Sequence, residues 1–376
     1  MSLAKKYKMT LRTLSPVHIG NGEKIPALFF AKINQNEFGR LKENRFFEIF
    51  SKSIGTMKRE LQKGWGIPIL NEVIRNIRLN RSDFLYFCQL DASRFQGEVS
   101  EFVHHPNGEF YIPGSSLKGA LRIALLFKIL EPIKEKLNQK VEKELRDSRR
   151  ITRRQLARLL RDYVDSYIRN ATENKLKINS DYMRAFRFFD SEPTNTKPKI
   201  VEMMLFKLSS DNFIKVDSRR RGLLEALPEQ VEIKFDVSID MGIIEMLERE
   251  FQKFQSPIPE NLDELLKIAD EFYRKVLEEE IKFLENYDHR AVTNKVITFY
   301  NKLLKNSKKI IHLGYGGGSN AMSLFLLLRD DLKKKIRNVI RDHGNMPAPL
   351  SRRYVVFEEH GFIKAAVPFG WCEVEI

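Results

Sequence analysis

Residues 231–240 constrain the fold more than any other part of this sequence. Apolar and polar residues alternate along them without interruption. Successive side chains of a strand point to opposite faces, so the pattern predicts a strand with one buried and one solvated face. A sheet that faces water on one side is typical of antiparallel architectures whose other side is covered by helices.

The other predicted elements occur in runs rather than in regular alternation. Further strands are predicted at 10–14, 186–189, 200–208, 353–357 and 367–374. Helices are predicted at 115–130, over much of 133–170, in segments up to Leu304, and at 321–341. Residues 84–90 fit either a strand or the end of a helix. The order favours two α+β modules over a doubly wound parallel sheet, with a boundary at 228.

Two turns that contain glycine each lead into a predicted helix. Residues 111–122 read YIPGSSLKGALR, and residues 312–320 read HLGYGGGSN. Free N–H groups at a helix start attract anions, and glycine lets a phosphate backbone come close. Ser115 is the predicted N-cap of the first helix, and Ser319 or Asn320 that of the second. The turns predict a phosphate-rich partner, with a flexible connection as the alternative for the second.

The details of both turns narrow their interpretation. The second lacks the Lys and Ser or Thr of a P-loop, and Ser319 stands where a dinucleotide-binding loop has its third glycine. In the first, Lys118 and Arg122 share one face of the opening helical turns. Either an anion lies between these two cations or both are solvated. Gly119, inside the helix, marks a place of close backbone approach.

Charge favours nucleic acid as the partner. The chain has 65 Lys and Arg against 50 Asp and Glu, a net charge of +15. Such a surface concentrates polyanions, although a charge-rich surface also suits proteins from hot habitats. The region 133–170 is rich in arginine, which could line a groove for phosphates or form a solvated face. Its closely spaced arginines are Arg146, Arg149, Arg150, Arg153, Arg154, Arg158 and Arg161.

Histidines and cysteines limit the available chemistry. The histidines are scattered at His18, His104, His105, His289, His312, His343 and His360. No H-E-x-x-H motif or cysteine partner accompanies them, so we predict no metal and no cofactor. His18, in a loop beside glycine, is the best candidate for a general acid or base, but spacing places no second catalytic group.

Cellular location is suggested by what the sequence lacks. Cys88 and Cys372 are the only cysteines, too few for a disulfide scaffold. The chain starts without the apolar core of a signal peptide, and it has no run of about 18 apolar residues. We therefore expect a soluble cytoplasmic protein in a reducing compartment.

Three motifs, taken in order, resemble one known family. They read LSPVHIGNG at 14–22, YIPGSSLKGALR at 111–122 and LGYGGGS at 313–319. Together they resemble the RAMP superfamily of CRISPR proteins. With the basic helical insertion, the chain looks most like the family of fifth subunits of type III-A Csm effector complexes. Residues 135–185 and 245–305 match nothing recognised.

This resemblance implies an α+β fold of two ferredoxin-like (RRM-like) modules with helical insertions. Residues 1–228 would form the first, with a basic insertion at about 133–185, and residues 229–376 the second, with the glycine-rich loop. The resemblance places the following residues at or near RNA: His18, Ser115, Ser116, Lys118, Arg122, Gly314, Tyr315, Gly316, Gly317, Gly318 and Ser319. Tyr315 also offers a ring on which a base can stack.

The resulting hypothesis is a non-catalytic RNA-binding subunit of a type III-A antiviral complex. It would cap the filament at the 3′ end of the CRISPR RNA (crRNA) and contribute to maturation of that end. Its partners would be other Csm subunits, above all the backbone RAMP subunit, with host nucleases as further candidates and no membrane. Two alternatives stay open: a metal-independent endoribonuclease using His18, and an assembly protein with only incidental RNA contact.

Overall fold

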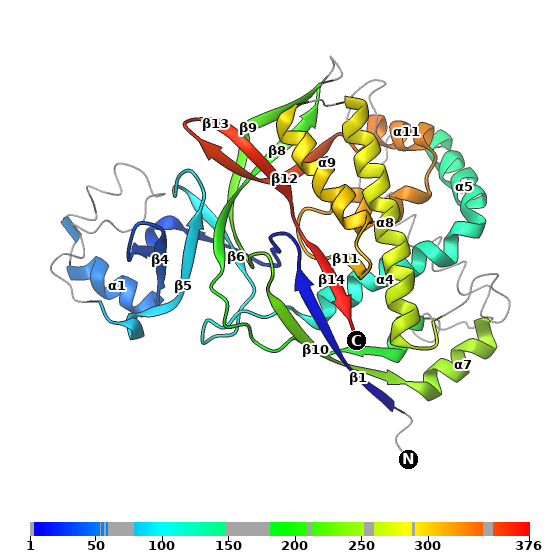
Figure 1. The fold of residues 1–376 in the computed structure, drawn as a ribbon, viewed down its shortest axis with the longest axis horizontal. Coiled ribbons are helices and arrows are strands. Elements are labelled where there is room, and N and C mark those ends of the chain that lie inside the picture. The colour runs from blue at the N-terminus through cyan, green and yellow to red at the C-terminus, as the bar shows by residue number, and fades with distance from the viewer. Residues whose placement is uncertain are drawn as a thin grey trace.

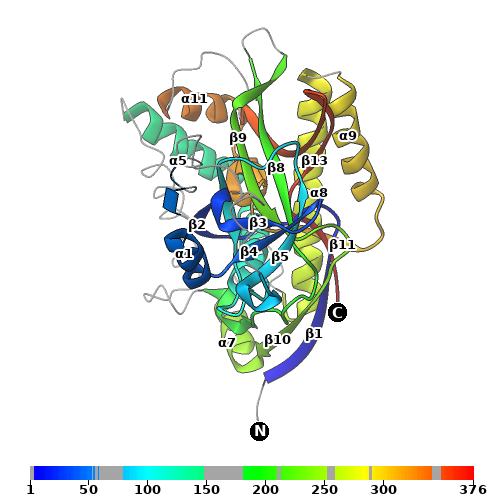
Figure 2. The ribbon, with the colours of Figure 1, turned by 90° about the vertical axis from the view of Figure 1, so that its left-hand side faces the viewer.

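The computed structural model describes residues 4–52, 54–55, 58, 79–147, 181–209, 213–251, 259–287, 290–340 and 349–376. These residues form two sheets and a group of helices (Figure 1). In Figure 1 a small lobe around α1 and β4 lies at the left, and helices α4, α5, α8, α9 and α11 lie at the right. Figure 2 shows β8 and β9 as a long hairpin that reaches toward the top of the molecule.

The smaller sheet contains five antiparallel strands among the described residues, in the order β11-β14-β1-β10-β7. Its strands are β1 (Ala4–Thr13), β7 (Phe186–Phe188), β10 (Glu232–Asp240), β11 (Lys309–His312) and β14 (Trp371–Glu375). Burial alternates along β10, with Ile233, Phe235 and Val237 buried. The strand predicted at 231–240, with one face in water, is thus confirmed.

The larger sheet contains nine strands among the described residues, in the order β2-β6-β9-β8-β5-β4-β3, with β12 pairing with β8 and β13. The strands are β2 (Gly20–Pro26), β3 (Phe30–Lys32), β4 (Glu37–Leu41), β5 (Phe84–Asp91), β6 (Glu98–Phe102), β8 (Lys199–Leu208), β9 (Ile214–Ala226), β12 (Ser351–Glu359) and β13 (Phe362–Pro368). The apolar run 84–90 is therefore a strand, and it pairs with β4 and β8.

The helices bury their apolar faces against the sheets and against each other. They are α1 (Glu43–Lys52), α4 (Gly114–Leu130), α5 (Lys134–Asp147), α7 (Met241–Phe251), α8 (Leu262–Tyr287), α9 (Ala291–Leu304), α10 (Gly318–Met322) and α11 (Asp330–Ile340). Helix α8 contacts α4, α9 and β11 and buries Leu265, Phe272 and Leu284 in the main core. None of the described helices is long and apolar enough to cross a lipid bilayer.

Charged side chains from the helices seal both edges of the smaller sheet. At the β7 edge, Lys118 Nζ of α4 donates to the Phe186 carbonyl at 2.8 Å. At the β11 edge, Asp270 of α8 accepts from the Ile310 N–H at 2.8 Å. Each contact satisfies one backbone group of an edge strand, which would otherwise be open to pairing with another chain.

The sheets with inserted helices confirm the predicted α+β class. Each sheet, however, takes strands from both sides of residue 228. Strand β1 pairs with β10 and β14, and β12 pairs with β8. The two modules are therefore interleaved in space, and the division into 1–228 and 229–376 stays a prediction. Of the predicted basic insertion, 148–180 lies outside the described residues.

Two predicted elements were wrong in length. The helix predicted at 321–341 is broken at Ser323, whose backbone is extended, and continues as a short 3-10 turn before α11. The Ser323 hydroxyl accepts from the Phe325 N–H and starts that turn. The strand predicted at 367–374 is interrupted at Gly370, whose φ is +80°, so its halves enter different sheets as β13 and β14.

Candidate nucleic-acid interface

The first motif and the glycine-rich turn lie side by side, although they are far apart in the sequence. The Tyr315 N–H donates to the His18 carbonyl at 2.8 Å. The Gly370 N–H donates to the Pro16 carbonyl at 2.9 Å, and the Leu313 N–H donates to the Gly370 carbonyl at 2.7 Å. Backbone hydrogen bonds therefore join three segments: the first loop (residues 14–22), the glycine turn (residues 312–320) and Gly370 at the start of β14. We call this unit the loop junction.

Packing explains most of the glycines in this turn. A Cβ on Gly314 would lie 2.2 Å from the His18 carbonyl oxygen, and one on Gly316 would lie 2.6 Å from Phe369. At Gly317 it would lie 2.7 Å from the His312 ring. Gly318 has nothing within 4 Å. It is the exposed glycine of the turn, so a ligand can approach the backbone there.

The predicted caps after the glycine turn were wrong. Helix α10 begins at Gly318 with Gly317 as N-cap and no side-chain cap, so Ser319 and Asn320 lie inside it. Asn320 instead donates to the Glu280 carboxylate on α8 at 2.7 Å. Ser319 is half-buried, and its carbonyl accepts from the Ser323 hydroxyl. A contact across the fold has therefore replaced local capping.

The side chain of His18, a residue of the first loop, is enclosed by the protein. Its ring is buried, its Nδ1 lies 2.6 Å from the Glu225 carbonyl, and its ring meets Phe102 and Tyr315 edge to face. Burial lowers the pKa of His18, so the imidazole is neutral at pH 7. These contacts fit a packing role, and its direct contact with RNA stays a prediction.

Tyr315 is the half-buried aromatic residue of the junction. It packs edge to face on Phe369 with ring centres 5.5 Å apart. The exposed Arg353 of β12 places its guanidinium 5.9 Å from the centre of the Tyr315 ring. The ring and the guanidinium together form a surface on which a base and a phosphate can be bound. The sequence motif includes Tyr315 but not Arg353, which lies far from it in the chain and meets its ring only in the folded protein, and contact of Tyr315 with RNA stays a prediction.

The start of α4 differs from the prediction. The helix begins at Gly114 with Pro113 as N-cap, so Ser115 is not the cap and lies exposed in the first turn. The carboxylate of Asp190, which follows β7, accepts from the Gly114 N–H at 2.9 Å. A Cβ on Gly114 would lie 2.2 Å from the Phe188 carbonyl oxygen. An acidic side chain of the protein thus already occupies this helix start.

The other residues predicted on α4 have partners within the protein. Lys118 is half-buried against β7, and burial together with the neighbouring Arg122 lowers its pKa. Arg122 forms an ion pair with Asp181 at 2.7 Å. Ser116 donates its N–H to the Pro113 carbonyl. The sequence left two alternatives, an anion between Lys118 and Arg122 or solvation of both side chains, and the structure matches neither, because both cations contact groups of the protein. Their contact with RNA stays a prediction.

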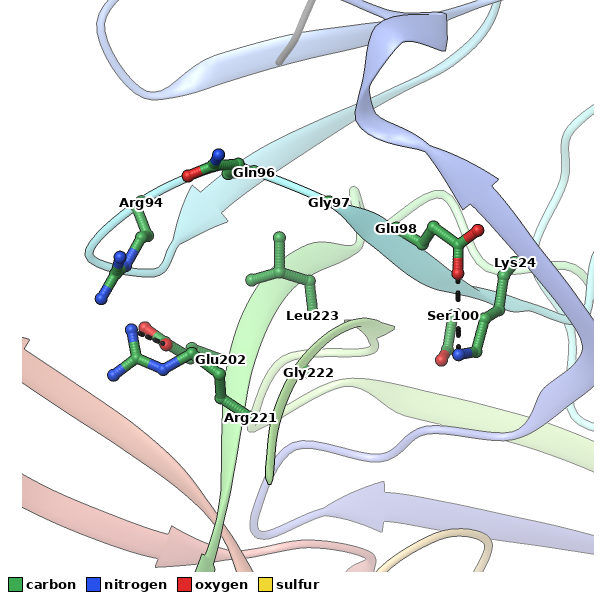
Figure 3. A pocket seen from close by; sticks show the side chains of 10 residues that line it. All are labelled: Lys24, Arg94, Gln96, Gly97, Glu98, Ser100, Glu202, Arg221, Gly222 and Leu223. Atoms are coloured by element: carbon green, nitrogen blue, oxygen red, sulfur yellow. Dashed lines mark ion pairs between the residues drawn. The ribbon is translucent and has the colours of Figure 1, made fainter. Parts of the chain in front are cut away.

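A cleft of about 340 Å³ is lined by residues of β2, β6, β8 and β9 and of the segment that precedes β6 (Figure 3). Lys24 pairs with Glu98 at 3.7 Å, and Arg221 pairs with Glu202 at 3.1 Å. Arg94 is left as the remaining cation, with no ion-pair partner among the described residues. Because acids neutralise most of its cations, this cleft is a weaker candidate for an RNA backbone than the loop junction.

A buried carboxylate lies beneath the first loop. Both oxygens of Glu225 accept hydrogen bonds, from the Tyr86 hydroxyl at 2.6 Å and from the Phe102 N–H at 3.0 Å. Burial nevertheless raises the pKa of Glu225 to about 7, because transfer from water disfavours its charged form.

His104 lies beside this carboxylate. Its ring nitrogens lie 3.1 Å from a Glu101 carboxylate oxygen and 2.7 Å from the His105 carbonyl. Both neighbours are acceptors, so the doubly protonated ring fits the site. Burial opposes that charge, but the hydrogen bonds to Glu101 and His105 outweigh it and raise the pKa of His104.

The difference in unfolding free energy between the wild type and Glu225→Gln should fall as the pH rises from about 5 to about 8. This comparison isolates Glu225, because buried His18 and His312, whose pKa values are lowered, change stability in the opposite direction in both proteins. Unfolded Glu225 releases its proton near pH 4.5 and folded Glu225 near pH 7. Its ionisation therefore costs the folded state about 3 kcal/mol over this range. The contribution of protonated His104 is lost in the same direction, because its pKa is also raised. A difference between the two proteins that stays constant or grows over this pH range would contradict the assignment.

Among the described residues, no group of His, Cys, Asp and Glu side chains is arranged to hold a metal ion. Cys88 and Cys372 are buried free thiols. What the fold offers instead is backbone, aromatic and cationic groups gathered around the loop junction. The model of one family, the RAMP superfamily, matches residues 10–321, which is more than half of the chain.

The chain belongs to the RAMP superfamily. A curated relative of this RAMP protein is the "CRISPR system Cms protein Csm5" of Streptococcus thermophilus, 31% identical over 139 residues. That alignment covers 32% of this chain and 38% of the relative, so it spans less than half of the relative's length.

Two solved structures share the fold of this RAMP protein over nearly its whole length. A chain of a Csm–crRNA–target RNA ternary complex of a type III-A CRISPR-Cas system has a TM-score of 0.65 and 21% identity, covering 98% of this chain and 100% of that chain. Csm5 of T. onnurineus has a TM-score of 0.60 and 20% identity, covering 97% and 99%. The predicted resemblance to the fifth subunit of type III-A Csm complexes is confirmed.

Proposed function

We propose that this protein is a non-catalytic RNA-binding subunit of a type III-A Csm effector complex. The observation that carries the proposal is the shared fold, over 98% of the chain, with a chain of a Csm–crRNA–target RNA complex. In this proposal the protein caps the filament at the crRNA 3′ end in the cytoplasm, contributes to maturation of that end, and contacts the backbone RAMP subunit. Recruitment of host nucleases belongs to the same proposal.

Two properties of the chain support RNA as the ligand. Its net charge of +15 attracts polyanions over distance. The loop junction places the open backbone at Gly318 and the Tyr315 ring, with Arg353 beside it, on one surface element. Backbone amides, a stacking ring and a guanidinium are the groups with which proteins hold a single strand without cutting it.

The endoribonuclease alternative rests on His18 as a general acid or base. The His18 ring is 4% exposed, hydrogen-bonded to the backbone and neutral. A general base must reach the proton that it removes, and the substrate cannot meet a ring enclosed by Phe102 and Tyr315. These contacts favour the non-catalytic role.

Titration of the full chain with single-stranded repeat RNA tests the proposal. If about five phosphates are contacted, affinity should fall roughly 100-fold between 50 and 200 mM salt. An assembly protein with incidental RNA contact would instead show almost no slope.

Incubation of the same RNA in EDTA tests the alternative. The RNA should remain intact with the wild type and with His18→Ala. Cleavage by the wild type that disappears in His18→Ala would replace the proposed role with that of a metal-independent endoribonuclease.

A further inference from the structure

The outer face of the smaller sheet carries a set of side chains that belongs to none of the three motifs. The strand register places Ser238 of β10 opposite both Arg187 of β7 and Lys6 of β1. The next outward position of β10 is Asp236, which lies opposite Lys8. Side chains alternate between the faces of a strand, so these residues share the face turned away from the helices. Strands β1 and β10 run through the lower part of Figures 1 and 2.

Phe189 completes this face. It directly follows β7, and its N–H continues the ladder by donating to the Asp236 carbonyl at 3.2 Å. Its side chain is 54% exposed. The adjoining backbone is held in place, because Asp190 binds the Gly114 N–H and the Phe189 carbonyl lies against Gly114. A rigid backbone therefore presents an aromatic ring to water beside Arg187.

The charges on this face leave a positive surplus. Asp236 pairs with Lys8 at 3.2 Å, and Asp240 lies 3.7 Å from Arg187. Lys6 and Lys234 are exposed on the same face. Neither has an ion-pair partner within the described part of the chain. Two lysines thus remain without an ion pair. Lys6 is the freer of the two, because the exposed Glu192 donates its N–H to the Lys234 carbonyl and so lies beside Lys234.

We propose that the outer face of β7, β10 and β1 is a second binding surface for single-stranded RNA. A base stacks on Phe189, and neighbouring phosphates lie at Lys6 and Lys234. The proposal rests on the proposed function in one respect, that the ligand of this protein is RNA. It adds a surface that the loop junction and the start of α4 do not include.

The composition of the face favours RNA over a protein neighbour. The cores of protein interfaces are depleted in charge and rich in contiguous apolar area. Here a single exposed ring lies among lysines and an arginine. Sheet faces with exposed aromatic and basic residues bind single-stranded RNA by stacking and by phosphate contacts.

The test compares variants of the full chain with a fluorescent single-stranded RNA. Phe189→Ala should weaken binding about 5-fold or more without changing the salt slope, because stacking involves no counterion release. Lys6→Glu should weaken binding and also reduce the slope. Phe189→Trp should retain the affinity of the wild type.

Matched controls come from β13 in the larger sheet. Phe362 is 71% exposed, and Lys364 is an exposed strand lysine. Phe362→Ala and Lys364→Glu remove the same groups from another surface, and they should leave affinity within about twofold of the wild type. If the test and control variants lose RNA affinity equally, the loss reflects the total charge and exposed apolar surface of the protein rather than a particular binding surface. That result would overturn the proposal.

The remaining outcomes separate this inference from the proposed function. If the wild type does not bind RNA at all, the proposed function fails. If the wild type binds RNA and both Phe189→Ala and Lys6→Glu bind equally well, only the second surface fails. If these variants retain RNA binding but no longer assemble with other Csm subunits, the face contacts protein and the inference is overturned. Should Phe189→Ala not fold, Lys6→Glu and Phe189→Trp decide the question.

Discussion

Gly314→Ala is expected to destabilise the protein by about 2–5 kcal/mol. The backbone of Gly314 has a φ of +70°, a region that costs residues with a Cβ about 1–2 kcal/mol. The new methyl carbon would also lie 2.2 Å from the His18 carbonyl oxygen. That oxygen accepts the Tyr315 N–H, so relief of the clash breaks the bond that joins the two loops. Overpacking of this kind adds about 1–3 kcal/mol.

Gly318→Ala is the matched control for this variant. Gly318 has a φ of +61°, but a Cβ there meets nothing within 4 Å. We therefore expect only the conformational cost of about 1–2 kcal/mol. Denaturant unfolding of both variants measures the difference. Equal losses would show that the loop junction adjusts to the extra carbon. The close approach of Gly314 to the His18 carbonyl would then not be what requires glycine at position 314.

Glu280→Ala is expected to cost about 3–5 kcal/mol, the loss typical of a broken buried ion pair. Glu280 of α8 binds Arg352 of β12 through one oxygen and Asn320 of α10 through the other. Arg352 also donates to the Pro349 carbonyl at 2.8 Å and lies 3.8 Å from the centre of the Phe283 ring. Removal of the carboxylate leaves a guanidinium that is buried and lacks its counter-charge.

Glu271→Ala serves as the control for Glu280→Ala, because it removes a carboxylate from the same helix. Glu271 pairs with Lys128 at 2.9 Å, but the two side chains are 43% and 32% exposed. A solvent-exposed pair of this kind contributes about 0–1 kcal/mol. Thermal or denaturant unfolding should therefore separate the two variants clearly. A small loss in Glu280→Ala would mean that the glycine turn and β12 do not depend on this network.

Local sequence patterns predicted those strands and helices that bury one regular face. The alternation in β10 and the cluster of apolar residues in β8 marked them as strands because each has a buried face. The helix predicted at 115–130 was found within one residue of its true start. The motif residues of the loop junction were also found, because glycines in a turn are visible without knowledge of their neighbours.

Other features could not be read locally, because distant residues decide them. Asp190 replaces Ser115 at the start of α4, and Glu280 takes the Asn320 amide that the sequence assigned to a cap. Gly370 divides the strand predicted at 367–374 between two sheets. Arg353 lies beside Tyr315 only because β12 reaches the loop junction.

Although it did not indicate the long strand β9 or the edge strand β11, the sequence by itself determined the α+β class, the basic character, strands such as β8 and β10, the helix α4 and the three motifs that identify a RAMP protein. These depend on hydrophobic periodicity, composition and turn residues, which act over a few neighbouring positions. Only the tertiary structure decided that His18 is enclosed, that Lys118 seals a sheet edge, and that Phe189 and Lys6 share an open face. Burial, electrostatic pairing and strand register depend on residues far apart in the chain, so no local pattern contains them.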